Sequence, residues 1–185
     1  MSQTLPDNFY ERIKPRLHRR IGREVRLARR VLDLGCGGCD LVRHLVEAYG
    51  QEVTGVDISS NSFPAKRRLP NGSGFHCLKR DAAKMGFAAD GGADAVVTMW
   101  ALHEMAKPRA ILREVRRVLR PGGEIVVVDF PRGSLAQRLW DEDYYRPREI
   151  EALLREVGFE RVRVRLIEKG QVIWARADQP LAGAN

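Results

Sequence analysis

The chain has 185 residues, a mass of 20.9 kDa and a formal net charge of +8, with 44% hydrophobic and 30% charged residues. This length supports one full core rather than two domains, and the balance excludes disordered, fibrous and membrane-spanning proteins. The first residues lack the apolar stretch of a secretory signal, and three cysteines favour a reducing compartment, so we expect a cytoplasmic protein.

The positive charge is concentrated near the N-terminus, where residues 9–30 hold nine basic and two acidic side chains. Apolar residues recur there every four positions, at Ile13, Leu17, Ile21 and Val25. This spacing predicts an amphipathic helix with its arginines on a solvated face. Pro15 suits a first helical turn, so we expect the main helix to begin there, after a kink or break. The alternative use of this basic arm is to bind nucleic acid or an anionic membrane.

Short apolar runs then alternate with helical patterns. The predicted strands are 30–34, 53–57, 75–78, 93–99 and 125–130. The predicted helices are opened by Asp40, Pro108 and Pro147 and closed by Gly50, Pro121 and Gly158. The side chain of Asp40 is expected to cap its helix. Two last strands, 161–167 and 171–175, predict a closing β-hairpin.

Continuous rather than alternating apolar runs indicate parallel strands that are covered on both faces. We therefore expect an α/β fold: a doubly wound, Rossmann-like, mostly parallel seven-stranded sheet with helices on both faces and a C-terminal antiparallel β-hairpin. Residues 1–30 would form the basic helical arm, 31–177 the domain and 178–185 a frayed tail. The segment 59–74 is rich in Ser, Asn, Pro and Gly, so any helix in it is short.

Ligands of such sheets bind beyond the carboxyl ends of the strands, which here means the loop Gly35-Cys36-Gly37. A dinucleotide-binding loop requires Gly or Ala three positions after Gly37, where this chain has Asp40. Asp33 and Asp40 on either side of the loop would repel a pyrophosphate. One like-charged pair about 4 Å apart costs roughly 4 kcal/mol at an effective dielectric near 20. A ligand with an ammonium and a sulfonium fits better, which disfavours a dehydrogenase.

Three runs point to one family when taken together. They are Val31-Leu32-Asp33-Leu34-Gly35-Cys36-Gly37, Val53-Thr54-Gly55-Val56-Asp57 and Leu119-Arg120-Pro121-Gly122-Gly123. The combination resembles the class I S-adenosylmethionine-dependent methyltransferases, most of all the small-molecule group typified by quinone-biosynthesis methyltransferases. The resemblance covers about residues 31–128. It implies S-adenosylmethionine as cofactor and S-adenosylhomocysteine as product.

The resemblance also implies site residues. Asp33, Gly35, Cys36 and Gly37 match the first motif, whose backbone approaches the methionine portion while Asp33 organises its amino group. The family usually has a third glycine in this loop, where this chain has Cys39. That departure means that either the Cys39 side chain tucks beneath the following helix or the affinity for the cofactor is reduced.

The nucleoside half of the cofactor is assigned by the same resemblance. Asp57 matches the acid that holds both ribose hydroxyls, and Ile58 beside it would flank the adenine. Asp81-Ala82 matches the pair that reads the adenine amine and ring nitrogen, although an Asp after a strand can also cap a turn. The fourth-strand motif, whose terminal backbone borders the methionine group, ends at Met99 and Trp100.

The pair Cys36-x-x-Cys39 invites a metal or redox interpretation. A zinc site needs three or four ligands, no second such pair exists, and His76-Cys77 would have to come from another strand. We therefore expect small apolar thiols packed beneath the loop, and no metal.

His103 lies where the transferred methyl group should point, and it is the candidate catalytic residue. It could act as a general base for a phenol, thiol or amine, or be a hydrogen-bonded histidine that fixes a turn. Positioning alone can supply roughly 7–11 kcal/mol to an in-line displacement, so no base is obligatory. The segment 129–146 is either a substrate lid or, through Trp140 and Tyr145, part of the core.

The leading hypothesis is a methyltransferase that moves a methyl group to a small-molecule acceptor by in-line displacement. One alternative is an RNA or protein methyltransferase that uses the basic arm, although nucleic acid is not favoured because no aromatic residues alternate with the arginines. Another is a non-catalytic protein that only binds S-adenosylmethionine. The methylated atom and the oligomeric state stay open.

Overall fold

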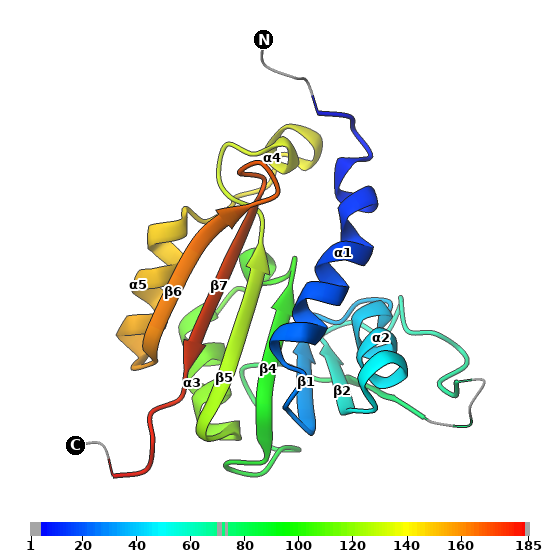
Figure 1. Cartoon of the computed structure of the whole chain (residues 1–185), viewed down its shortest axis with the longest axis vertical. Helices are drawn as coiled ribbons and strands as arrows, with labels where there is room; N and C mark the ends of the chain where they lie inside the picture. Colours follow the sequence, from blue (N-terminus) through cyan, green and yellow to red (C-terminus); the bar gives the residue numbers. More distant parts are fainter. Residues whose placement is uncertain (1–4, 70–71, 73, 184–185) are drawn as a thin grey trace.

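The computed structural model describes residues 5–69, 72 and 74–183. Its centre is a seven-stranded sheet with the strand order β3-β2-β1-β4-β5-β7-β6 (Figure 1). The strands are β1 Arg30–Leu34, β2 Glu52–Asp57, β3 His76–Lys79, β4 Ala93–Met99, β5 Leu119–Asp129, β6 Glu160–Ile167 and β7 Val172–Asp178. The first five pair in parallel, and β7 is antiparallel to both β5 and β6. The expected fold class is confirmed.

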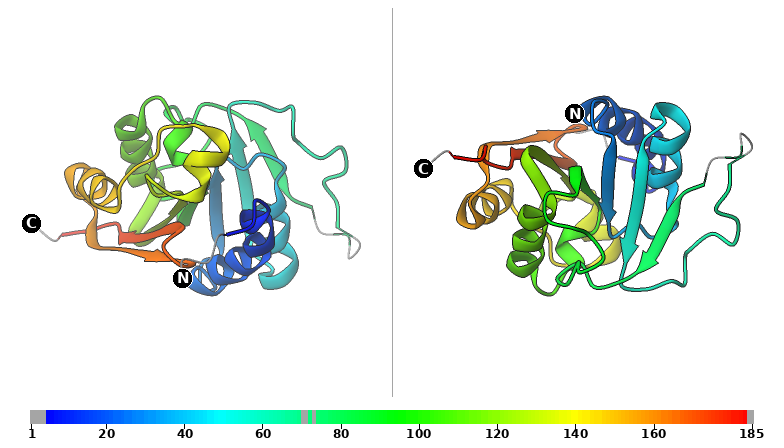
Figure 2. Two further views of the ribbon diagram at one scale, coloured as in Figure 1. Left: turned by 90° about the horizontal axis from the view of Figure 1, so that it is seen from above. Right: turned by 90° about the horizontal axis from the view of Figure 1, so that it is seen from below.

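Helices cover both faces of the sheet (Figure 2). They are α1 Phe9–Glu24, α2 Asp40–Tyr49, α3 Pro108–Val118, α4 Leu135–Trp140 and α5 Pro147–Val157, with the short 3-10 helix η1 Leu102–Glu104. The apolar faces of α1 and α2 pack into one core cluster, and those of α3 and α5 into the other, on opposite faces of the sheet. No helix in the described part of the chain is long and apolar enough to cross a membrane.

The helix α1 begins earlier than the sequence predicted. Pro15 lies inside it rather than at its first turn, without a break before it. Proline cannot donate the amide hydrogen bond to the carbonyl of Glu11, but both residues are exposed, so water can solvate that carbonyl. The predicted apolar stripe is confirmed, because Ile13, Leu17 and Ile21 are all at most 3% exposed.

The start of α2 also differs from the prediction. Asp40 is the first helical residue and not the cap, and Cys39 takes the capping position in a left-handed conformation without a side-chain hydrogen bond. The Asp40 carboxylate instead lies 2.6 Å from the ammonium of Lys14. A cation on α1 therefore competes for the oxygen that would have capped the helix, and the ion pair joins the two helices.

Two other segments depart from their predicted boundaries. The strand β5 begins at Leu119, with a register shift opposite β4, so Pro121 lies within a strand and not at a helix end. Asp178, which we expected in a frayed tail, is the last residue of β7, and the amide of Gln179 donates to the carbonyl of Gly123. Among the described residues of 59–74 there is no helix, while positions 70, 71 and 73 lie outside the described residues.

Candidate active site

The first parallel strand ends in a turn that only glycine fits. Gly35 has φ +74°, and a Cβ built there would lie 2.2 Å from the Cβ of Ala101 beyond β4. The amides of Gly35 and Cys36 both donate to the carbonyl of Val56 at the end of β2. This close approach brings the ends of β1, β2 and β4 together at one edge of the sheet.

Asp57 at the end of β2 is held by two backbone amides. Gly37 N donates to one of its carboxylate oxygens, Oδ2, at 2.9 Å, and Ser59 N donates to the other, Oδ1, also at 2.9 Å. The carboxylate is thus fixed against the glycine loop while it remains part of a cavity wall. A carboxylate in this place can still accept hydrogen bonds from ligand hydroxyls.

A cavity of about 550 Å³ opens at this edge of the sheet. Its wall contains most of the residues that the sequence assigned to the cofactor, namely Gly35, Gly37, Asp57, Ile58, Asp81, Ala82 and Trp100. The assigned residues Asp33, Cys36 and Met99 lie outside the wall, and so does His103.

Sequence reasoning missed another part of the wall. Arg80 follows β3, and a further group lies between β4 and α3 and on α3 itself, namely Ala101, Glu104, Met105, Ala106, Lys107 and Ile111. The residues from Ala101 to Lys107 could have been found by their position, because they follow the fourth strand and precede the helix opened by Pro108.

Asp33 lies beneath the loop with only 2% of its surface exposed. Burial, followed by the charge of Asp57, raises the pKa of Asp33 to about 7. An acid of this kind is half-ionised near neutral pH, and a neighbouring cation would favour its charged form. Cys36, beside it, stays a thiol because burial raises its pKa, and the charges of Asp33 and Asp57 raise it further.

These groups fit a cationic nucleoside such as S-adenosylmethionine. The wall offers the carboxylates of Asp57 and Asp81 for hydroxyl and amine donors, with Asp33 below for positive charge. Ile58 is 70% exposed at the cavity, as expected for an apolar side chain that a flat base would cover. Asp81 also accepts the amide of Ala83 at 2.8 Å, so the turn-capping role and a place in the wall occur together.

His103 is held in a hydrogen-bond chain between two acids and lies outside the cavity wall. Its Nδ1 lies 2.7 Å from Oδ1 of Asp129 and its Nε2 lies 3.1 Å from Oε2 of Glu142. The side chain of His103 is 3% exposed and that of Asp129 is fully buried. Burial lowers the pKa of His103, but the hydrogen bond and charge of Asp129 outweigh it and raise the pKa above 6.5. Neither acid was assigned a role from the sequence.

An aromatic cluster adjoins this histidine and reaches the cavity through Trp100. It consists of Tyr10, Trp100, Phe130, Trp140 and Tyr144. The indole of Trp100 stacks on the ring of Phe130 with their centroids 5.1 Å apart. Helix α1 and the segment 129–146 thus meet beside the cavity. In that segment Tyr144 is buried and Tyr145 is partly buried, while Trp140 is 47% exposed.

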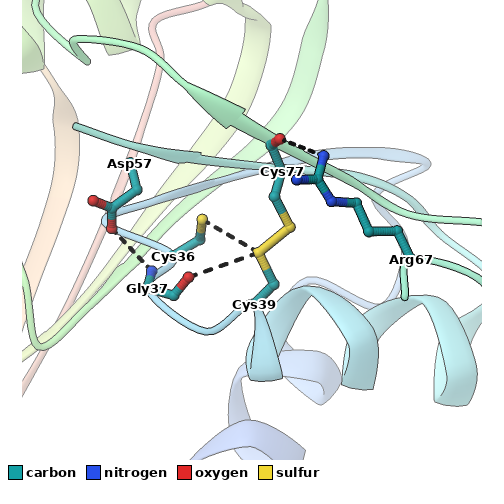
Figure 3. Close-up of a disulfide and its surroundings, with 6 residues drawn as sticks. All are labelled: Cys36, Gly37, Cys39, Asp57, Arg67 and Cys77. Atoms are coloured by element: carbon teal, nitrogen blue, oxygen red, sulfur yellow. Dashed lines mark hydrogen bonds between the residues drawn. A yellow bond between two sulfur atoms is a disulfide. The ribbon is translucent and has the colours of Figure 1, made fainter. Parts of the chain in front are cut away.

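Three cysteine side chains meet beneath the glycine loop (Figure 3). Cys39 and Cys77 are joined as a disulfide, and the sulfur of Cys36 lies 3.6 Å from that of Cys39. The expectation that Cys36 and Cys39 pack as thiols beneath the loop therefore holds for Cys36 and is wrong for Cys39, which is bonded to Cys77. The cause is the sheet register, which pairs Cys77 on β3 with Gly55 on β2 and leaves no side chain between the sulfurs.

Comparisons with known proteins agree with this geometry. Residues 32–127 match the family model described as "Methyltransferase domain". The chain is 38% identical over 106 residues to a demethylmenaquinone methyltransferase of Thermus thermophilus, a match that covers 56% of this chain and 48% of that protein. It is 33% identical over 167 residues to an uncharacterized methyltransferase of Synechocystis, covering 81% of this chain and 76% of that protein.

A solved structure gives the same picture. A SAM-dependent methyltransferase from Archaeoglobus fulgidus superposes with a TM-score of 0.75 at 20% identity, covering 91% of this chain and 93% of that one. This likeness shows the fold. The chain spans about half the length of the Thermus relative, so the substrate of that protein does not transfer to this one directly.

Proposed function

This chain belongs to the methyltransferase-domain family, and on that premise we propose that it transfers the methyl group of S-adenosylmethionine to a small aromatic acceptor. The cofactor and the enzyme class follow from the family. The acceptor class is our inference. The observation that carries it is the aromatic cluster that adjoins the cofactor cavity at Trp100.

The cofactor side of the proposal uses the residues of the wall and those beneath it. Asp57 would accept the ribose hydroxyls, and Asp81 with Ala82 would read the adenine edge. Gly35 and Gly37 would let the backbone approach the methionine portion, and the buried Asp33 would balance its positive charge. Bound S-adenosylmethionine supplies a methyl group on a sulfonium, which is already activated for displacement. The protein therefore has to align an acceptor and exclude water.

The acceptor side of the proposal rests on the aromatic side chains. Stacking of flat rings favours an aromatic acceptor, because Tyr10, Trp100 and Phe130 offer edges and faces within one cluster. Demethylmenaquinone methyltransferase, the name of one relative, supports an acceptor of this shape.

His103 is the proposed general base. Asp129 accepts the hydrogen bond of Nδ1–H, so in the neutral ring Nε2 carries the lone pair. This lone pair is free to accept a proton once Glu142 moves away. Glu142 is suited to withdraw because its side chain is 47% exposed. Asp129 is then a positioning residue, which fixes the ring and its tautomer.

A methyl-transfer assay tests this proposal. Protein, methyl-tritiated S-adenosylmethionine and a protein-free extract of aromatic metabolites are incubated, and the products are extracted into organic solvent. We expect label in the organic phase that depends on the protein. Label that appears only when RNA or protein is added, in the acid-precipitable fraction, would overturn the proposed acceptor class.

A further inference from the structure

The three sulfur atoms come from three different parts of the fold. Cys36 lies in the glycine loop, Cys39 lies at the start of α2, and Cys77 lies on β3 (Figure 3). All three side chains are buried. A Cβ on Gly55 would lie 2.7 Å from the sulfur of Cys36, so this glycine on β2 makes the space in which the sulfurs meet.

Cys39 holds an unfavourable backbone conformation in this cluster. Its φ is +59°, in the left-handed region. Glycine adopts this region freely, whereas it is unfavourable for residues that carry a Cβ atom. Its side chain makes the covalent bond to Cys77, which fixes the residue from the far side of β2. The bond therefore opposes the tendency of residue 39 to leave this conformation.

The conformation of residue 39 is connected to the cavity through a short stretch of backbone. Cys39 N donates to the carbonyl of Cys36 at 2.8 Å, which closes the turn that contains Gly37. Gly37 in turn donates to Asp57, and both line the cavity. A relaxation at residue 39 would therefore move the amide that orients the Asp57 carboxylate.

We propose that the Cys39–Cys77 disulfide is a redox-controlled tie that keeps the glycine loop in its cofactor-binding conformation, so that reduction weakens cofactor binding. This inference rests on the proposed assignment of the loop and of Asp57 to the cofactor. The reductant is a dithiol. Its two sulfurs lose two hydrogens and join, the S–S bond of the protein breaks, and Cys39 and Cys77 each gain one proton and one electron.

The experiment compares one protein in two oxidation states. Thiols are counted in denaturant before and after treatment with a dithiol, with one per chain expected in the oxidised protein and three in the reduced one. The dissociation constant for S-adenosylhomocysteine is then measured by calorimetry in both states. Reduction should raise it by about five- to tenfold, as expected when a left-handed non-glycine residue loses its support.

Two variants that lack the disulfide distinguish the effect of losing this bond from other effects of the dithiol. Cys77→Ala keeps the strained Cys39 without its bond, so it should bind as weakly as the reduced protein, with or without dithiol. Cys39→Gly removes both the bond and the strain, so it should bind within about twofold of the oxidised protein in both conditions. Thermal unfolding of each variant checks that it is folded.

Several other results would overturn the inference or the proposed cofactor site. Three free thiols in the oxidised preparation would overturn the inference, and so would an unchanged dissociation constant after complete reduction. A Cys36–Cys39 bond found by peptide mapping in place of Cys39–Cys77 would also overturn it. Folded, oxidised protein that binds no S-adenosylhomocysteine at all would instead contradict the proposed cofactor site, and this inference with it.

Discussion

The amide of Gly37 donates a 2.9 Å hydrogen bond to Oδ2 of Asp57, across the gap between the loop after β1 and the end of β2. The two residues are twenty positions apart in the sequence. The bond fixes the acid that we assign to the ribose at the edge of the cavity. The loop and the carboxylate thus form one unit.

The first prediction concerns Asp57. Replacement by Ala removes the acceptor of two ribose hydroxyls and the partner of Gly37, so the affinity for S-adenosylhomocysteine should fall by about 100-fold or more. Calorimetry measures this, and circular dichroism checks the fold. Asp90→Ala is the control, because the side chain of Asp90 is 81% exposed and lies outside the cavity wall. Equal affinities for the two variants would refute the assignment.

The second prediction concerns pH and Asp33, whose pKa is raised to about 7 by burial and then by the charge of Asp57. A cationic ligand favours the ionised acid, so S-adenosylmethionine should bind more weakly at pH 6 than at pH 8, by up to about tenfold. Binding at pH 6.5 should release a proton, which calorimetry in buffers of different ionisation enthalpy detects. In Asp33→Asn this release should disappear, and its persistence would exclude Asp33 as the source.

The same group affects stability. Between pH 3.8, its ordinary value, and about 7, folded Asp33 keeps a proton that the unfolded chain has lost. Its contribution to the free energy of unfolding is therefore full below this window and decreases as the pH rises through it. Urea unfolding at several pH values should show a smaller decrease in Asp33→Asn than in the parent protein. If the free energy of unfolding changed equally with pH in both proteins, the raised pKa of Asp33 would be contradicted.

The third prediction concerns the two loop glycines. In Gly35→Ala the new Cβ would lie 2.2 Å from the Cβ of Ala101, so the free energy of unfolding should fall by about 2–4 kcal/mol. In Gly37→Ala the Cβ meets nothing within 4 Å, so only the left-handed strain of about 1–2 kcal/mol remains. Chemical unfolding measures the free energy of unfolding of both variants. A larger loss for Gly37→Ala than for Gly35→Ala would contradict the close approach of Gly35 to Ala101.

The fourth prediction concerns Asp129 and His103. Asp129→Asn removes the charge that raises the pKa of His103, so the acidic limb of the kcat profile should move to lower pH. The value of kcat should fall by about tenfold or more while KM stays within about twofold, because the variant loses ring positioning and not acceptor binding. Glu142→Gln is the control and should leave kcat within about threefold. If the pH profile of kcat did not shift in Asp129→Asn, the role of His103 would be structural and not that of a base.

The sequence was informative wherever one local pattern decided the structure. The strand β4 was predicted at Ala93–Met99, as found, and α5 is closed by Gly158 as predicted, with this glycine in a left-handed conformation. About half of the wall was predictable as well, because residues such as Asp57 directly follow parallel strands, whose carboxyl ends meet at one edge.

The errors arise where a distant contact outweighs a local preference. Asp40 would cap α2 if Lys14 on another helix did not hold its carboxylate. Cys39 meets Cys77 at a sequence separation of 38, through a register between β2 and β3 that no local pattern encodes. The hydrogen bond from His103 to Asp129 likewise joins η1, which follows β4, to the end of β5, and only the sheet order makes these two segments neighbours.

The most direct test of the central claim is a competition for the cavity between a nucleoside that carries an ammonium and no phosphate and a dinucleotide that carries a pyrophosphate. The dissociation constants of S-adenosylhomocysteine and NADH are measured by calorimetry on the same oxidised protein at pH 8. Asp57 and Asp81 in the cavity wall, with Asp33 buried beneath the loop, predict binding of S-adenosylhomocysteine that NADH does not displace. Displacement by NADH at equal concentration would mean that the cavity accepts a pyrophosphate, and the assignment of the site would be wrong.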